Sequence, residues 1–227
     1  MHPTASSSAR RRDFAFAALM LLLAAASTVA NVARAQSAAV VGVYDGGQME
    51  MAAGLELKPD GRFNYALSYG ALDEQAAGKW TVRGDSVLLT SDPIVAPRFV
   101  LVSHGRGADG LLRVDLDVPR GVSRQYFDAL ITLGNGQTRK VQLSDEGLLL
   151  PFARGDVPAS LRMLLPVFSV LGEPVKLDRI SGYSVRFRFD PNDLGKVDFR
   201  AEPLRILNGD LMLDRHGRSI RFKRARQ

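Results

Sequence analysis

The chain has 227 residues, no cysteine, and a formal net charge of +6 from 30 basic and 24 acidic side chains. The lack of cysteine excludes disulfide bridges, thiolate metal sites, a cysteine nucleophile and a lipidated N-terminal cysteine. The positive charge does not indicate a nucleic-acid-binding face, because six basic residues lie in the last 13 positions, and residues 36–214 carry 20 basic against 23 acidic groups. The basic tail alternates with Ile220 and Phe222, which predicts a last strand whose outward arginines and lysine discourage edge pairing.

Residues 1–35 have the layout of a secretory signal peptide. A basic start at residues 10–12 precedes an apolar run over residues 14–26, and small residues at positions 33–35 supply a cleavage site. We therefore predict a mature chain that begins at Gln36 and is periplasmic or secreted. The apolar run is short for a membrane span, which needs about 20 apolar residues, and no later segment is expected to span a membrane. The Arg-Arg pair also fits a twin-arginine signal, so both export routes stay open.

Alternating apolar and polar residues predict β-strands in the mature chain. Residues 55–58 and 62–69 each place apolar side chains on one face, and the Pro-Asp-Gly between them predicts a turn. Similar turn signals recur about every 8–14 residues, which is typical of a β-sandwich or barrel. One short helix is expected at residues 159–165, where Pro166 would end it. The sequence therefore predicts an all-β fold.

Two polar breaks, at residues 103–110 and 178–183, divide this pattern. We expect a barrel-like module built from residues 36–104 and 182–227. The segment between them, residues 110–179, is expected to form a β-sandwich-like module that is inserted into the barrel or follows it.

A series of short motifs occupies residues 42–91: a Gly-x-Tyr strand, a Leu-x-Leu before an Asp-Gly-aromatic turn, a Gly-x-Trp, and a Gly-Asp turn into Val-Leu-Leu. This series resembles the N-terminal lipocalin-like barrel of the copper-homeostasis and envelope-stress lipoprotein family. The resemblance implies a small antiparallel barrel. The Cys-x-x-Cys and the lipobox cysteine of that family are absent here, so the resemblance does not imply membrane anchoring or thiol-based metal sensing. Residues 111–161 faintly resemble a transthyretin-like or carboxypeptidase-regulatory-like sandwich.

Three aromatic residues, Tyr65, Tyr69 and Trp80, are candidates for lining a ligand site. The two tyrosines share one face of the strand at residues 62–69. If the strands curl into a barrel, this face points inward, where rings either fill the interior or line the mouth of a ligand cavity. Both interpretations stay open, and the second predicts a small apolar ligand.

Met49 and Met51 occupy the place where the resembled family carries its cysteine pair. Two thioethers at positions i and i+2 of one strand would point the same way, and soft sulfur ligands suit Cu(I). The alternative is that both methionines fill gaps in the core. Copper, bound weakly by these two methionines, is therefore the one cofactor that we consider.

The sequence shows no arrangement of catalytic residues. Residues 105–110 match the dinucleotide-binding glycine pattern, but a predicted strand follows them where that site needs a helix. Residues 190–195 carry only part of a calcium-loop pattern. Ser103 and His104 are adjacent on a predicted strand, so their side chains point to opposite faces and cannot form a nucleophile and its base.

We therefore expect an exported, non-catalytic binding or envelope-associated protein. Its partner would be an envelope protein or a small apolar ligand, with no role in nucleic-acid binding. A hydrolase whose catalytic residues are not recognisable remains the alternative from another class.

Overall fold

The computed structural model describes residues 38–153, 155–177 and 182–225. The predicted signal peptide and part of the predicted break at 178–183 lie outside these ranges. The described residues form an all-β protein, with helical geometry confined to a turn at residues 38–40 and two 3-10 turns, η1 (Arg124–Tyr126) and η2 (Pro166–Phe168). This confirms the predicted fold class. None of the described helices has the length and apolar character needed to cross a membrane.

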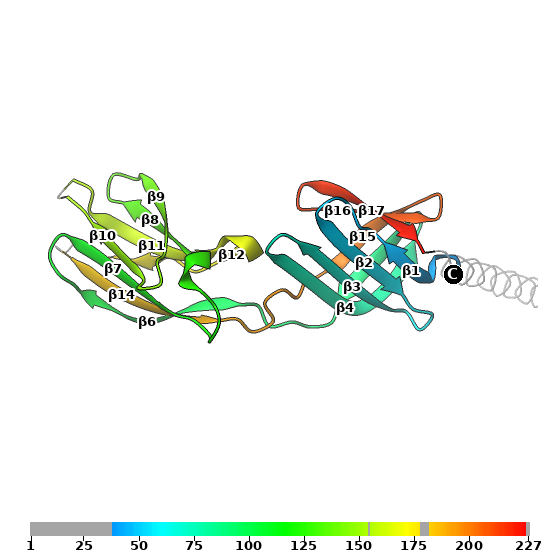
Figure 1. The fold of residues 1–227 in the computed structure, drawn as a ribbon, viewed down its shortest axis with the longest axis horizontal. Helices are drawn as coiled ribbons and strands as arrows, with labels where there is room; N and C mark the ends of the chain where they lie inside the picture. Colours follow the sequence, from blue (N-terminus) through cyan, green and yellow to red (C-terminus); the bar gives the residue numbers. More distant parts are fainter. Residues whose placement is uncertain (1–37, 154, 178–181, 226–227) are drawn as a thin grey trace, which may run out of the picture. The chain divides into compact units, whose positions relative to one another are not determined.

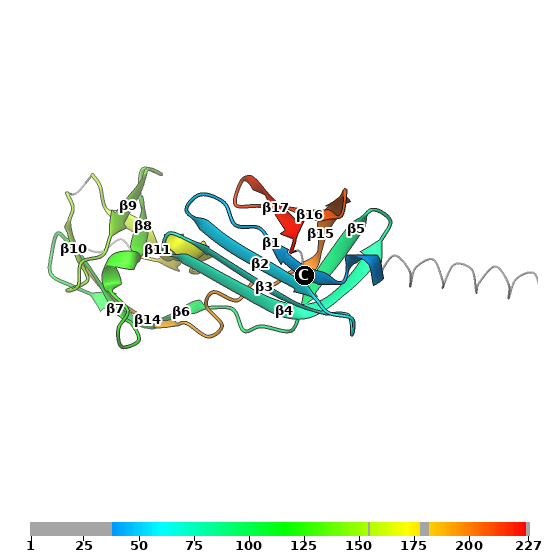
Figure 2. The same ribbon diagram turned by 45° about the vertical axis from the view of Figure 1, so that its right-hand side comes forward.

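Eight antiparallel strands form a closed barrel (Figure 1). These strands are β1 (Gly42–Asp45), β2 (Met51–Leu57), β3 (Arg62–Tyr69), β4 (Leu72–Arg83), β5 (Ser86–Ser91), β15 (Arg200–Leu207), β16 (Asp210–Arg215) and β17 (Arg218–Arg224). Neighbours around the barrel follow chain order, and β1 closes it by pairing with both β2 and β17. Figure 2 shows β2, β3 and β4 lying side by side.

Closure of the barrel corrects one expectation for the basic C-terminal segment. The arginines and lysine of β17 suggested a last strand that protects an exposed sheet edge. In the structure β17 pairs with β16 on one side and with β1 on the other, so it is not an edge. The charged side chains of β17 alternate with buried Ile220 and Phe222, as expected for one wall of a barrel.

The barrel interior follows from the period of two in its strands. In β4, buried and exposed residues alternate over most of the strand, and β2 buries every second residue. Gly78 allows a close contact inside this wall, because a Cβ there would lie 2.1 Å from the carbonyl oxygen of Thr90. The first hairpin, including the turn at Asp60–Gly61, is as predicted: Phe63 and Tyr65 of β3 point inward and are buried.

The remaining strands form two sheets within the segment between β5 and β15, which is therefore an insertion in the barrel. The four-stranded sheet has the order β10-β7-β14-β6, and the second sheet has the order β12-β11-β8-β9, with β13 also paired to β11. The strands are β6 (Arg98–Arg106), β7 (Leu111–Asp117), β8 (Asp128–Leu133), β9 (Thr138–Gln142), β10 (Leu148–Pro151), β11 (Pro158–Leu165), β12 (Val170–Leu171), β13 (Val175–Lys176) and β14 (Tyr183–Asp190).

By its internal contacts the chain divides into two compact units. The second unit comprises residues 93–198 together with the hairpin segment 67–75, and the barrel unit holds the rest of the described chain. Two backbone hydrogen bonds of 2.9 Å join Gln75 of that hairpin to residues 195 and 197. The buried core of the second unit lies between its two sheets and contains a cluster of aromatic rings, with Phe127 edge-on to both Phe99 and Phe189.

Two details of the second unit correct the sequence predictions. The strands β6 and β14 were expected in the barrel, in the modules 36–104 and 182–227, but they pair antiparallel with each other, and β14 also pairs parallel with β7. The barrel strands therefore stop at Ser91 and resume at Arg200. The predicted helix at residues 159–165 is wrong, because this segment is β11 and buries residues 161, 163 and 165 at a period of two.

Candidate functional site

Two of the three aromatic candidates lie in the packed interior of the barrel. Tyr65 and Trp80 are 3% and 6% exposed, whereas Tyr69 is 36% exposed. The Tyr65 ring lies edge-on to Phe199, with centroids 5.2 Å apart, and it also contacts Phe222. Trp80 donates a hydrogen bond from Nε1 to the carbonyl oxygen of Lys58 at 3.1 Å. Around Tyr65 and Trp80, side chains therefore fill the barrel interior.

The two candidate copper ligands do not share a strand face. Met49 lies in the turn between β1 and β2 with 89% of its surface exposed, while Met51 begins β2 and is 7% exposed. Glu50 between them has a positive φ of 63°, which breaks the regular strand geometry on which the shared face depended. The premise of a common face is therefore wrong. Within the described ranges, no group of three or more His, Cys, Asp or Glu side chains is placed to hold a metal ion.

An apolar cavity of about 370 Å³ lies in the second unit. Its lining comes from the loop before η1, from η1 and the residue after it, from the β11–η2 corner, from β14 with the turn after it, and from the hairpin segment. The lining residues are Ala71, Gly121, Val122, Tyr126, Phe127, Leu165, Val167, Phe168, Phe189 and Leu194. None of these side chains carries a charge, and the Tyr126 hydroxyl is the one polar side-chain group in the set.

The exposure of the lining distinguishes the floor of the cavity from its rim. Phe127, Phe189 and Leu165 are 0–4% exposed and belong to the core between the sheets. Val122 and Tyr126 are 36% and 55% exposed. The cavity is therefore open to solvent on the side of the 119–126 segment, and apolar rings lie at its base. Large exposed apolar side chains around a concave site are typical of a binding surface.

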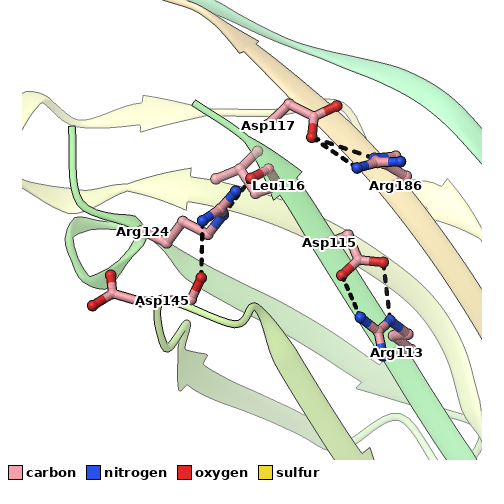
Figure 3. Close-up of polar contacts among 7 residues, drawn as sticks. All are labelled: Arg113, Asp115, Leu116, Asp117, Arg124, Asp145 and Arg186. Atoms are coloured by element: carbon pink, nitrogen blue, oxygen red, sulfur yellow. Dashed lines mark hydrogen bonds and ion pairs between the residues drawn. The ribbon is translucent and has the colours of Figure 1, made fainter. Parts of the chain in front are cut away.

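Arg124 holds the segment that forms this rim. Its Nε donates to the carbonyl oxygen of Leu116 at 2.6 Å, and its Nη1 donates to the carbonyl oxygen of Asp145 at 2.8 Å (Figure 3). The Asp145 carboxylate in turn accepts hydrogen bonds from Ser123 Oγ and Gln125 Nε2, at 3.1 and 3.0 Å. The side chains on both sides of Arg124 are thus tied to the same turn, which fixes η1 and the adjacent Tyr126.

Arginine and aspartate side chains alternate on the outward face of the four-stranded sheet. Figure 3 shows Arg113 bonded to Asp115 on β7, and Asp117 of β7 paired with Arg186 of β14. Farther along β14, Arg188 donates to Asp190 and thereby lowers the pKa of that carboxyl below its ordinary value, an effect to which Arg98 adds. A lowered pKa keeps the Asp190 carboxyl ionised, which suits a solvated structural face.

The weaker sequence motifs have structural roles in turns and strands. Residues 105–110 end β6 and lead into β7, as the predicted strand required, and Gly107 approaches residue 182 with an N–H···O bond of 3.1 Å. In the 190–195 segment, the Asp193 carboxylate accepts a hydrogen bond from Val95 N at 2.8 Å and pairs with Lys196 at 2.7 Å. These bonds close a turn, and Lys196 supplies the positive charge that balances this carboxylate.

Comparison of the chain with protein-family models, with curated proteins and with solved structures finds no match. Of what the motifs at residues 42–91 implied, the structure confirms the antiparallel barrel, which closes with eight strands.

The lining of the cavity was not predicted from the sequence. Its residues come from four separate parts of the chain, so no local spacing connects them all. One signal in the sequence is the adjacent pair Tyr126 and Phe127, which interrupts an otherwise polar stretch. In the structure the ring of Phe127 is buried and that of Tyr126 is exposed. An aromatic pair in a loop of this kind indicates that one ring anchors the loop and leaves the other at the surface.

Proposed function

We propose that this protein is an exported, non-catalytic binding protein that takes a small, uncharged, apolar ligand into the cavity of its second unit. The observation that carries the proposal is the cavity of about 370 Å³ lined by apolar side chains, with aromatic rings at its base. This volume lies in the range of about 300–1,000 Å³ that small-molecule sites occupy.

The lining chemistry argues for a neutral ligand. A charged group taken into this cavity would lose its hydration without meeting an opposite charge among the lining residues, which is strongly unfavourable. In the described part of the chain, no buried side-chain nitrogen or oxygen lacks a hydrogen-bond partner, so no orphaned polar atom awaits a polar ligand. A hydrocarbon or aromatic group, with at most one hydroxyl or carbonyl near Tyr126, fits these constraints.

The barrel in this proposal is lipocalin-like in architecture but does not hold the ligand. The motif series at residues 42–91 and the closed eight-stranded barrel support the lipocalin-like assignment. The contacts of Tyr65 with Phe199 and Phe222 favour a packed interior over a ligand cup. The proposed export rests on the basic, apolar and small-residue layout of residues 1–35.

The binding proposal is tested with N-phenyl-1-naphthylamine, a neutral apolar dye that becomes fluorescent when it is buried. We expect saturable binding of one dye molecule per chain. Val122→Trp places a large ring at the rim and should weaken binding about tenfold or more, since it fills space that the dye needs. Val95→Trp is the matched control, because Val95 belongs to the same unit, is 62% exposed and does not line the cavity. Equal affinities in the two variants would refute the proposed site.

Export is tested separately by N-terminal sequencing of the protein isolated from the periplasm and the medium of a producing bacterium. The expected mature N-terminus is Gln36. Protein that stays in the cytoplasm with residues 1–35 attached would contradict export while leaving the binding result unaffected.

A further inference from the structure

The strand β6 forms one edge of the four-stranded sheet in the second unit (Figure 1). It spans Arg98–Arg106 and pairs over its length with β14, with one irregularity at Val102. From Leu101 to its end every residue of β6 is exposed, with Leu101 and Val102 at 39% and 50%. A long apolar edge of this kind offers unpaired backbone N–H and C=O groups to another extended segment.

The other edges of the two sheets carry the usual protection against such pairing. The opposite edge, β10, has four residues and ends in Pro151. In the second sheet, β9 carries the neighbouring cations Arg139 and Lys140, and β12 has only two residues. Short length, proline and charged side chains in the middle of an edge strand all discourage strand addition, whereas the two arginines of β6 lie at its ends. Among the described edge strands of this unit, β6 thus stands apart in combining length with an apolar centre.

We propose that β6 is a docking edge on which an extended segment of a partner protein adds as a further strand, with acidic residues opposite Arg98 and Arg106. The charges of the strand carry the choice of partner. β6 contains these two arginines and His104 but no carboxylate, and the arginine side chains are 67% and 72% exposed. A guanidinium has five N–H donors, and the contacts of Arg98 with Asp190 and of Arg106 with Asp109 each use one of them.

The same charges disfavour a second copy of this chain as the occupant. If two β6 strands paired antiparallel about Val102, Arg98 of each copy would lie at the same end of the pair as Arg106 of the other, but on the opposite face, because the irregularity at Val102 offsets their side chains. The irregularity in both strands would interrupt the ladder at its centre, and the like charges at each end would repel. Registers that avoid this repulsion shorten the pairing. An acidic extended segment of another protein makes the full-length pairing favourable, with backbone hydrogen bonds for affinity and the two arginines for specificity.

The experiment uses the mature protein and two labelled synthetic peptides of 8 residues, the length of β14, which pairs with β6 from Arg98 to Arg106. Each peptide has alternating Val and Thr between its ends. One peptide has Glu at both ends and the other has Lys. Fluorescence anisotropy measures the affinity of each peptide, and hydrogen exchange measures the protection of the β6 amides. The protein variant is Arg98→Glu/Arg106→Glu. The matched control is Lys79→Glu/Arg83→Glu on β4, which makes the same change in net charge on exposed positions of the barrel unit.

We expect the Glu peptide to bind the native protein and to slow exchange in residues 98–106. The Arg98→Glu/Arg106→Glu variant should bind the Glu peptide about tenfold more weakly, because two opposite-charge pairs become like-charge pairs. It should bind the Lys peptide correspondingly more tightly, because two like-charge pairs become opposite-charge pairs. Binding of the Lys peptide also shows that the variant is folded. The control variant should behave like the native protein.

Three results would overturn the proposal: equal binding of both peptides, peptide binding without protection of residues 98–106, or a dimer in native mass spectrometry in which those amides are already protected. The last result would identify a second copy as the occupant. None of these measurements depends on the cavity, so this inference and the proposed ligand function stand or fall separately.

Discussion

The ring of Tyr65 lies edge-on to the ring of Phe199 inside the barrel, at a centroid distance of 5.2 Å and an interplanar angle of 74°. Tyr65 belongs to β3, which precedes the insertion in the sequence, and Phe199 follows the insertion, immediately before β15. This contact therefore ties the part of the barrel made before the insertion to the part made after it. Edge-to-face pairs of this kind stabilise a core beyond the area that they bury.

Replacement of Tyr65 should destabilise the barrel strongly. Tyr65→Ala is expected to lower the free energy of unfolding by about 3–5 kcal/mol, because it leaves a cavity among the aromatic rings. Urea unfolding followed by tryptophan fluorescence measures the effect on the barrel alone, since Trp80 is the single tryptophan of the chain and is buried there. Tyr69→Ala, at the 36% exposed position, is the control. Equal losses at both positions would contradict the packed interior.

Gly78 is expected to tolerate no side chain. A Cβ at this position would lie 2.1 Å from the carbonyl oxygen of Thr90 and 2.9 Å from the Phe63 ring, so Gly78→Ala should cost about 1–3 kcal/mol. Gly54→Ala is the matched control in a neighbouring part of the barrel, because its Cβ would meet nothing within 4 Å. The control should raise stability by about 0.4–1 kcal/mol through the unfolded state. The urea midpoint from Trp80 fluorescence decides between these directions.

Acid should weaken the barrel partly through Asp92. Arg62 donates to this carboxylate, with Nη1 and Oδ1 2.8 Å apart, and the hydrogen bond lowers the pKa of Asp92. A depressed carboxyl pKa stabilises the folded state above the unfolded pKa of about 3.9, and this contribution is lost as the pH falls through the folded value. Below about pH 4, the urea midpoint of the native protein should therefore decrease more steeply with falling pH than that of Asp92→Asn.

Two further measurements test this assignment. Arg62→Gln should reduce the steepness in the same way as Asp92→Asn, because it removes the donor that lowers the pKa. Salt at about 1 M should shrink the difference between native and variant proteins, since both side chains are partly exposed and their interaction is screened. A difference that persists unchanged in salt would indicate another origin.

Arg124 is expected to act as a positioning residue for the cavity. Its two bonds, to the carbonyl oxygens of Leu116 and Asp145, hold the segment that carries Tyr126. Arg124→Ala should therefore weaken binding of N-phenyl-1-naphthylamine about five- to tenfold, the equivalent of roughly 1 kcal/mol. Arg113→Ala is the control, because Arg113 bonds to Asp115 on its own strand. Unchanged affinity in Arg124→Ala would contradict this role.

The sequence predicted individual strands better than it predicted their neighbours. The hairpin of β2 and β3 was identified because its apolar residues alternate and a Pro-Asp-Gly turn separates them. The strands β6 and β14 were assigned to the wrong module because alternation shows that a segment is a strand but not which strand it pairs with. Residues 159–165 resembled a helix because Ala, Leu, Arg and Met all favour helices, although the apolar residues at 161, 163 and 165 have the period of a strand.

For the candidate site residues, too, the sequence predicted local features but not contacts with distant parts of the chain. Tyr65 lies on an inward face as predicted, whereas Tyr69 on the same strand is partly exposed. The surroundings of the Tyr65 ring depend on Phe199 and Phe222, which lie far along the chain. The expectation that Met49 and Met51 share a strand face was wrong, because the left-handed conformation of Glu50 has no clear signature in the sequence. Pairings across long separations depend on the tertiary fold and leave little local trace.

The order of strands around the barrel also has a consequence for how the chain acquires its structure. β1 pairs with β17, so the first and last described strands must meet before the wall is complete. The second unit, whose residues 93–198 are contiguous, is synthesised in full before β15–β17 exist, and domains tend to fold as units in the order of synthesis. Until then, the five earlier barrel strands form at most a curved sheet with two open edges. Such non-local pairing is slow, and a chaperone that shields these edges would have its greatest effect on this step.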